Sequence, residues 1–194
     1  MKTIDYYNHH AEEFANSTLH VDMESLYQPF LALLPENAHI LDLGCGAGRD
    51  SLAFKNKGYQ VDAMDYSVEL VKKTTALIGI QVKHQSFYDL SEVAVYDGIW
   101  ACASLLHCER YRLTEVLEKM LRALKPNGVI YMSFKYGDSD REKDGRAFTD
   151  LNEQQAHELL AEFDQVSLVQ QWITIDKRPQ REERWLNLIW KKND

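Results

Sequence analysis

Three glycines at alternate positions follow a short apolar run that contains an acid. The stretch ILDLGCGAGRDS places Asp42 two residues before Gly44, and Gly46 and Gly48 follow at the same spacing. Glycines lacking a side chain let the backbone lie directly against a ligand, and a nearby carboxylate can meet a cationic group. Since one glycine is enough for a tight turn, the three predict a ligand-binding loop, with Cys45 inside it.

Two phosphate-binding patterns fail at this loop. A P-loop requires GxxxxGK[ST], and no lysine follows these glycines. A dinucleotide fingerprint requires GxGxxG, and the third glycine would fall on Arg49 or Ser51, depending on the register. Both patterns are therefore excluded.

An acid followed by GxGxG resembles the class I S-adenosylmethionine-dependent methyltransferases, whose ligand has no phosphate. The resemblance extends over residues 40–135 and includes the turn LKPNG, in which Asn127 replaces a glycine of the usual LkPGG. The run WACASLLH and the compact length are similar to tellurite-resistance-type and related small-molecule methyltransferases. The resemblance implies S-adenosylmethionine as the cofactor and one methyltransferase domain over residues 1–194. That domain would have an N-terminal helical lid (1–35) and a catalytic core (36–194).

A second acid fits the same ligand. In the run QVDAMDYS, Asp65 ends the second expected strand, 21 residues after Gly44. A carboxylate at this place can accept hydrogen bonds from both ribose hydroxyls. Asp62 is the alternative, but alternation places it inside the strand. Tyr66 follows directly and can pack on the adenine.

The resemblance also implies cofactor contacts at the ends of two later strands. Relatives often place an acid against the adenine amino group, and here Ser86 takes that position, with Phe87 next to it. The chain departs from the commoner pattern there, and Asp89 is the other candidate. Ala101 and Cys102 would line the passage beside the transferable methyl group.

Methyl transfer from a sulfonium needs an aligned nucleophile, exclusion of water and, for a neutral nucleophile, removal of a proton. His107 is the candidate base just past the fourth expected strand, although a locally hydrogen-bonded loop histidine is the alternative. The segment YYNHHAEEFA is expected to fold over the cofactor, with Tyr6 and Tyr7 against the methionine moiety or the acceptor. We count Tyr7 as a catalytic candidate too; a half-buried amphipathic helix is the other interpretation.

Basic residues follow the fifth expected strand. The segment FKYGDSDREKDGRAF is predicted to be a polar loop at the ligand end of the sheet. Lys135 and Arg146 could bind an anionic acceptor, because a guanidinium holds a carboxylate in bidentate fashion. Interleaved acids make a solvated, salt-bridged loop an equal explanation. Residues 177–185, KRPQREERW, offer the one plausible site for an RNA phosphate, with a charged turn that protects a sheet edge as the alternative.

Short apolar runs alternate with amphipathic helices along the chain. Strands are expected over residues 40–43, 59–64, 80–84, 98–102 and 129–134. Helices are expected over residues 50–57, after Ser67, over 113–124 and over 156–163, with a turn at 125–128. Residues 166–175 and 185–190 have no helix between them, so we expect an antiparallel pair.

This order predicts an α/β fold with a seven-stranded, mostly parallel, doubly wound sheet, that is, a Rossmann-like methyltransferase fold. The last strand would be antiparallel, and helices would cover both faces. Ligands of such sheets bind beyond the carboxyl ends of the strands, where the glycine loop begins.

Bulk composition narrows the partners. The chain has 22 Lys and Arg against 30 Asp and Glu, a net charge of −8, which disfavours long nucleic acid. No apolar run approaches the ~20 residues of a membrane span, and the N-terminus lacks a secretion signal. Three cysteines without a CxxC pair are typical of a cytoplasmic protein, and no metal-binding spacing occurs.

The sequence therefore predicts a cytoplasmic, monomeric or homodimeric enzyme that transfers a methyl group to a small molecule. A tRNA or protein methyltransferase is one alternative. A non-catalytic module that binds an adenosine-containing ligand is another. Neither the acceptor nor its reacting atom follows from the residues, because one fold serves many acceptors.

Overall fold

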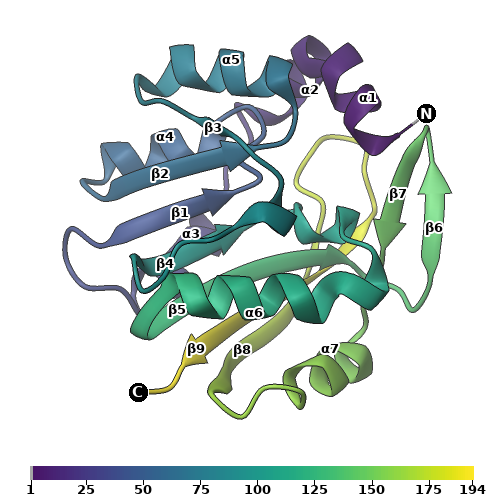
Figure 1. Cartoon of the computed structure of the whole chain (residues 1–194). Helices are drawn as coiled ribbons and strands as arrows, with labels where there is room; N and C mark the ends of the chain where they lie inside the picture. The colour runs from purple at the N-terminus through teal and green to yellow at the C-terminus, as the bar shows by residue number, and fades with distance from the viewer. Residues whose placement is uncertain (1) are drawn as a thin grey trace.

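A seven-stranded sheet forms the centre of the computed structural model, which describes residues 2–194 (Figure 1). The strands lie in the order β3-β2-β1-β4-β5-β9-β8. Their bounds are β1 (His39–Leu43), β2 (Gln60–Asp65), β3 (Lys83–His84), β4 (Tyr96–Ala101), β5 (Leu124–Lys135), β8 (Val166–Ile175) and β9 (Arg184–Lys192). The five strands from β3 to β5 are parallel, and β9 runs antiparallel between β5 and β8. The expected fold class, with its antiparallel last strand, is thus confirmed.

Helices cover both faces of this sheet (Figure 1). Their bounds are α1 (Thr3–His9), α2 (Ala11–Thr18), α3 (Glu24–Leu31), α4 (Arg49–Asn56), α5 (Val68–Ile78), α6 (Leu113–Ala123) and α7 (Glu153–Leu160). Three short 3₁₀ turns join them, η1 (Phe87–Asp89), η2 (Leu105–His107) and η3 (Arg110–Arg112). Adjacent residues of β1 lie on opposite faces of the sheet. Ile40 packs with Phe30 of α3 and Phe54 of α4, whereas Leu41 packs on the face that α6 covers.

Local sequence explains the helix boundaries. The buried residues of α6 recur every three or four positions, as an amphipathic helix requires. Ser67 begins α5 by accepting a hydrogen bond from the Leu70 amide at 3.3 Å, and Gly79 ends it in a left-handed conformation (φ 68°). The expected cap at Ser67 is therefore confirmed.

Two expected elements differ in extent. Only residues 83–84 of the expected third strand pair with β2, because the Val82 amide donates to Thr75 Oγ1 at 3.2 Å instead of joining the ladder. The expected turn at residues 125–128 lies within β5, which begins at Leu124. Asn127 does adopt the left-handed conformation (φ 62°) that its replacement of glycine suggests.

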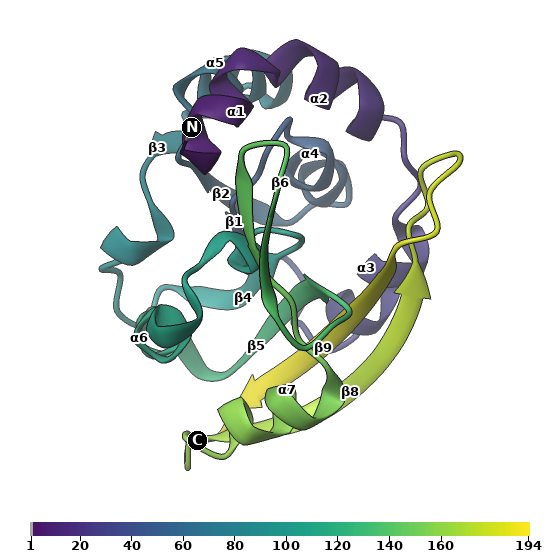
Figure 2. The ribbon, with the colours of Figure 1, turned by 90° about the vertical axis from the view of Figure 1, so that its right-hand side faces the viewer.

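The polar segment after β5 is not a loop, so that prediction was wrong. It forms a two-stranded hairpin of β6 (Asp140–Lys143) and β7 (Arg146–Thr149). Asp144 and Gly145 connect the strands with φ values of 52° and 74°, as a tight hairpin turn requires. Figure 2 shows the hairpin standing in front of the sheet, on the side toward which β1 and β2 point.

Gly48 illustrates how closely the helices approach the glycine loop. Its φ is 88°, and a Cβ there would lie 2.6 Å from Thr74 Cγ2 on α5. We expect Gly48→Ala to lower the free energy of unfolding by ~2–4 kcal/mol, combining left-handed strain with overpacking. Chemical denaturation followed by circular dichroism measures this loss.

Gly58 provides a matched control, because its φ is 93° and a Cβ there would meet nothing within 4 Å. Gly58→Ala should cost only the conformational strain of about 1–2 kcal/mol. Thr74→Ser removes the clashing methyl group but keeps the hydroxyl that donates to the Gly46 carbonyl at 2.7 Å. It should therefore restore part of the stability lost in Gly48→Ala. Equal losses in the two glycine variants would contradict the steric explanation.

Candidate active site

The glycine loop lies between the ends of β1 and β2. Gly44 has a φ of 80°, and a Cβ there would lie 2.5 Å from Ser104 Cβ, so only glycine fits. The amides of Gly44 and Cys45 both donate to the Met64 carbonyl at 2.9 Å. The loop is thus held against the end of β2 by its own backbone.

Asp65, the last residue of β2, fastens the same loop with its side chain. One carboxylate oxygen accepts from the Gly46 amide at 2.9 Å, and the other from the Ser67 amide at 2.8 Å. Burial raises the pKa of Asp65, although these backbone donors oppose the shift. Asp62, the alternative in the sequence, instead accepts from Tyr96 Oη at 3.0 Å, away from the loop.

A large cavity of about 780 Å³ opens in front of this loop. Many of the residues expected at the cofactor line it, namely Gly44, Gly46, Asp65, Tyr66, Ser86, Phe87 and Asp89. Tyr66 is 55% exposed and its ring stacks on His84 with the centroids 5.8 Å apart. The Ser86 hydroxyl accepts from the Tyr88 amide at 3.2 Å and caps η1. The structure therefore brings together candidates from three separate stretches of sequence.

Three expected cofactor residues line neither this cavity nor the second one described below. Asp42 is 2% exposed and accepts from Ser51 Oγ at 2.6 Å, and burial together with Asp50 raises its pKa. Ala101 is fully buried in the core, and Gly48 packs under Thr74. The Asp42 carboxylate thus lies beneath the loop and not at its ligand-facing side.

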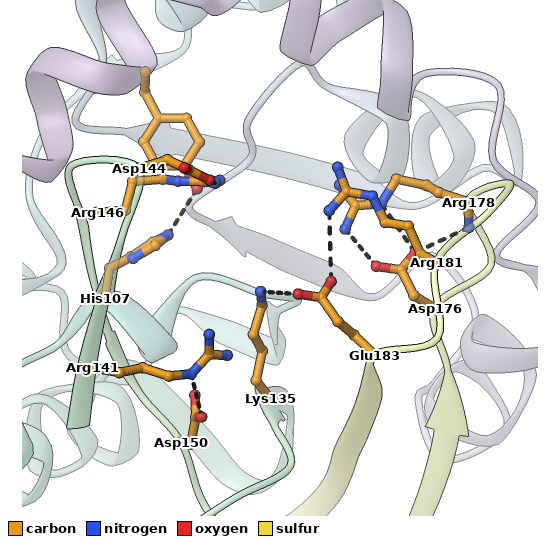
Figure 3. A network of polar contacts seen from close by, with 11 residues as sticks. His107, Lys135, Arg141, Asp144, Arg146, Asp150, Asp176, Arg178, Arg181 and Glu183 are labelled. Atoms are coloured by element: carbon orange, nitrogen blue, oxygen red, sulfur yellow. Dashed lines mark hydrogen bonds and ion pairs between the residues drawn. The ribbon is translucent and has the colours of Figure 1, made fainter. Parts of the chain in front are cut away.

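A second, smaller cavity of about 170 Å³ lies on the other side of the loop. Cys45 and Cys102 line it, together with six cationic side chains and two carboxylates. The cations are Arg49, Lys135, Arg146, Lys177, Arg178 and Arg181, and the carboxylates are Asp50 and Asp176. Residues of the hairpin and of the connection between β8 and β9 thus meet in space (Figure 3).

Ion pairs organise the cations of this smaller cavity. Lys135 is 7% exposed, and its Nζ lies 2.7 Å from Glu183 Oε1, while Arg178 Nε lies 3.0 Å from Asp176 Oδ1. Figure 3 shows Lys135 and Glu183 between the hairpin residues and the two arginines of the β8–β9 connection. Burial lowers the pKa of Lys135 even though Glu183 opposes the shift.

Asp50 is a site residue that the sequence did not single out. Its carboxylate accepts from Arg49 Nε at 2.7 Å, Tyr27 Oη at 2.6 Å and Trp100 Nε1 at 2.8 Å. Burial alone would raise its pKa, but Arg49 and these donors lower it. The adjacent opposite charges of Arg49 and Asp50, directly after the glycines, were the signal available in the sequence.

Tyr7 and His107 lie at the wall that the two cavities share. Tyr7 Oη is 2.8 Å from His107 Nε2, and His107 Nδ1 is 2.7 Å from the Ala147 carbonyl. Since a carbonyl can only accept, Nδ1 carries the proton, and Tyr7 donates to the free lone pair of Nε2. Burial, with Arg146 and Lys135 nearby, lowers the pKa of His107 to about 4, so the imidazole is neutral at pH 7.

The N-terminal helices contribute side chains to the walls of both cavities. Thr3 Oγ1 accepts from the Ala147 amide at 3.0 Å, and Ser67 Oγ donates to Asn8 Oδ1 at 2.7 Å, so α1 is fastened to both the hairpin and α5. Phe14 of α2 lines both cavities. Leu26 of α3 also lines the smaller cavity, whereas Phe30 of the same helix is fully buried against the sheet.

Two further kinds of feature are absent from residues 2–194. None of the helices has the length and apolar character that crossing a bilayer requires. No three His, Cys, Asp or Glu side chains of the described chain converge as metal ligands would.

Comparison with known proteins finds similarity to a methyltransferase domain. Residues 40–128 match the model of a methyltransferase domain. The Bacillus subtilis protein YqeM is 31% identical over 118 residues, which cover 54% of this chain and 47% of that protein. A ubiquinone biosynthesis O-methyltransferase of Xanthomonas axonopodis is 32% identical over 108 residues, covering 52% of this chain and 44% of the relative. The chain thus spans about half the length of these curated relatives.

A solved structure extends the likeness of the fold over almost the whole chain. The Burkholderia thailandensis 1,6-didemethyltoxoflavin-N1-methyltransferase, solved with that compound and S-adenosylhomocysteine, superposes with a TM-score of 0.79. The match covers 98% of this chain and 85% of that one at 22% identity. The sequence matches and the fold thus agree: residues 40–128 are similar to a methyltransferase domain, and almost the whole chain shares the fold of a solved methyltransferase.

Proposed function

We propose that the chain binds S-adenosylmethionine in the larger cavity and transfers its methyl group to a small molecule in the smaller one. One observation carries this proposal. The two cavities share the loop residues Gly44 and Gly46 and the wall residues Ala103, Tyr7 and His107. A methyl donor on one side of this wall and an acceptor on the other would meet there, as transfer requires.

The charges of the larger cavity support the methyl donor. Four acids and two cationic side chains line it, and the acids are Asp65, Asp89, Glu109 and Glu142. S-adenosylmethionine supplies an activated methyl group on a positively charged sulfonium. An acidic wall favours such a ligand, whereas the smaller cavity, with six cations, does not.

Asp65 can hold the ribose in addition to its backbone partners. A carboxylate has about four lone-pair sites, and the amides of Gly46 and Ser67 use two of them. Tyr66, Ser86 and Phe87 then lie where an adenine would stack and hydrogen-bond. Asp42 acts indirectly in this proposal, by fixing Ser51 beneath the loop.

Tyr7 and His107 are proposed to receive a proton from the acceptor. The lone pair of His107 Nε2 is the basic site in this set of hydrogen bonds: Nε2 accepts from the Tyr7 hydroxyl, and Nδ1 donates to the Ala147 carbonyl. A hydroxyl or amine that loses its proton as it is methylated can pass it to Nε2 through the Tyr7 hydroxyl. The proposal therefore favours an oxygen or nitrogen nucleophile.

Size favours a small acceptor over tRNA or protein. A cavity of ~150 Å³ holds a benzene ring, and the smaller cavity is of that order, about 170 Å³. Arg178, within the segment considered for RNA, pairs with Asp176 and lines this cavity. A relative in sequence is named for ubiquinone biosynthesis, and a protein of the same fold holds 1,6-didemethyltoxoflavin. Both names are consistent with a small acceptor.

Calorimetric titration with S-adenosylhomocysteine, with NAD as the comparison, tests the donor site. We expect Asp65→Ala to weaken S-adenosylhomocysteine binding by roughly 10- to 100-fold, the cost of about 1–3 kcal/mol of lost hydrogen bonds. Asp62→Ala is the control on the same strand and should leave binding unchanged. Binding of NAD alone would contradict the methyltransferase site, and binding without turnover of any acceptor would indicate a non-catalytic module.

A further inference from the structure

The smaller cavity differs in charge from the rest of the molecule. The chain has a net charge of −8, yet six cationic side chains and only two carboxylates line this one cavity. Cations gathered in a cavity of an acidic protein focus a positive potential there. The cavity is therefore suited to an anion.

Most of these cations already have a carboxylate partner. Arg49 pairs with Asp50 at 2.7 Å, Lys135 with Glu183 at 2.7 Å, and Arg178 with Asp176. Arg181 also faces Glu183, at 3.6 Å, and Lys177 is exposed at the rim and donates to Ser25 Oγ. These side chains shape the cavity but offer little uncompensated charge.

Arg146 is the exception. Its side chain is 18% exposed, and its one ion pair is a long contact, Nη2 to Asp144 Oδ2 at 3.4 Å. The Nε hydrogen has no hydrogen-bond partner among the described residues. A guanidinium has five donors in a planar fork, so most of those on Arg146 are unused.

The guanidinium of Arg146 is nevertheless fixed in place. Its central carbon lies 4.1 Å from the centre of the Tyr6 ring and 5.3 Å from that of Phe148. Stacking of this kind holds an arginine without using its donors. Arg146 also lies close enough to Tyr7 to counter the rise that burial causes in the pKa of that hydroxyl. The unused donors are therefore next to the wall where the methyl group would be transferred.

We infer that the methyl acceptor is a small ring compound bearing a carboxylate, which Arg146 binds while the ring packs in the smaller cavity beside Phe148 and Trp185. This inference rests on the proposed function and names its substrate class. A monoanion fits better than a phosphate dianion, because Asp50, Asp176 and Glu183 already neutralise most of the other cations. Aromatic side chains and a volume of about 170 Å³ suit a single ring.

Calorimetry on the full chain saturated with S-adenosylhomocysteine tests this inference with three probes, benzoate, benzamide and phenyl phosphate. Benzoate should bind at least tenfold more tightly than benzamide, which has the same shape without the charge. Arg146→Gln should weaken benzoate binding at least tenfold and leave the affinity for S-adenosylhomocysteine unchanged. Arg184→Gln is the control, because Arg184 lies over Tyr136 and lines neither cavity.

The outcomes separate the inference from the proposed function. Equal binding of benzoate and benzamide, tighter binding of phenyl phosphate, no binding of any probe, or an unchanged Arg146→Gln variant would each overturn the carboxylate site. Failure of S-adenosylhomocysteine to bind the unaltered chain would overturn the proposed function instead. That titration is made first and does not involve Arg146.

Discussion

Asp50→Ala is expected to lower the free energy of unfolding by about 3–5 kcal/mol, the largest effect of any single change to a charged side chain that we predict. The carboxylate is 6% exposed and accepts hydrogen bonds from Arg49, Tyr27 and Trp100. Removing it leaves a guanidinium and two further donors in the interior without their acceptor. Urea denaturation of the variant, followed by tryptophan fluorescence, measures the loss.

A surface pair of the same kind is the control. Glu115 accepts from Arg112 Nε at 2.9 Å and from Nη2 at 3.0 Å, but its side chain is 41% exposed. Exposed ion pairs contribute about 0–1 kcal/mol, so Glu115→Ala should have little effect. Similar losses of unfolding free energy in the two variants would mean that burial does not determine how strongly the Asp50 hydrogen bonds stabilise the fold.

Loss of the proton acceptor should have the largest effect on catalysis. We expect Tyr7→Phe and His107→Asn each to slow methyl transfer to a hydroxyl or amine by roughly 10²- to 10⁴-fold. Asparagine keeps a donor for the Ala147 carbonyl, so the local fold should persist. His157→Asn, on the exposed face of α7, is the control and should retain full activity. Single-turnover rates with bound S-adenosylmethionine separate this effect from binding; unchanged rates in both variants would exclude the role.

The pH dependence of the rate tests the same pair. The folded pKa of His107 is about 4, below the ordinary 6.5, so Nε2 remains free to accept a proton from pH 8 down to about pH 5. Between pH 6.5 and pH 4 the unfolded chain binds a proton at His107 that the folded chain does not bind. The free energy of unfolding therefore falls as the pH falls through this window. A catalytic inflection near pH 6.5 that disappears in His107→Asn would contradict a buried, neutral imidazole.

Sequence patterns predicted the elements that depend on local periodicity. The apolar runs of β1, β2, β4 and β5 and the helical spacing of α6 lie close to their expected positions. Alternation also placed Asp62 inside β2 and Asp65 at its end, as the structure has them. The hairpin of β6 and β7 escaped prediction because its residues are polar and offer no apolar alternation. Its Asp144–Gly145 turn was the signal that was available.

Contacts between distant residues explain what the sequence could not predict about the site. Asp50 meets Tyr27 and Trp100, which are 23 and 50 positions away, and no local pattern indicates either contact. The same holds for Arg146 and Tyr6, which stack although the strands β1 to β5 lie between them in the chain. Candidate residue types were recognisable, but which charges remain unpaired depends on tertiary packing.

The hairpin and the connection between β8 and β9 have a consequence for how this protein can diversify. Most of the cations of the smaller cavity belong to these two segments, whereas the glycine loop, Asp65 and Ser86 all precede residue 90. Under the proposed function, substitutions in the connection between β8 and β9 can therefore change which acceptor is bound without altering any residue that lines the larger cavity. Two specificities that must meet at one wall are thereby free to evolve in separate stretches of the gene.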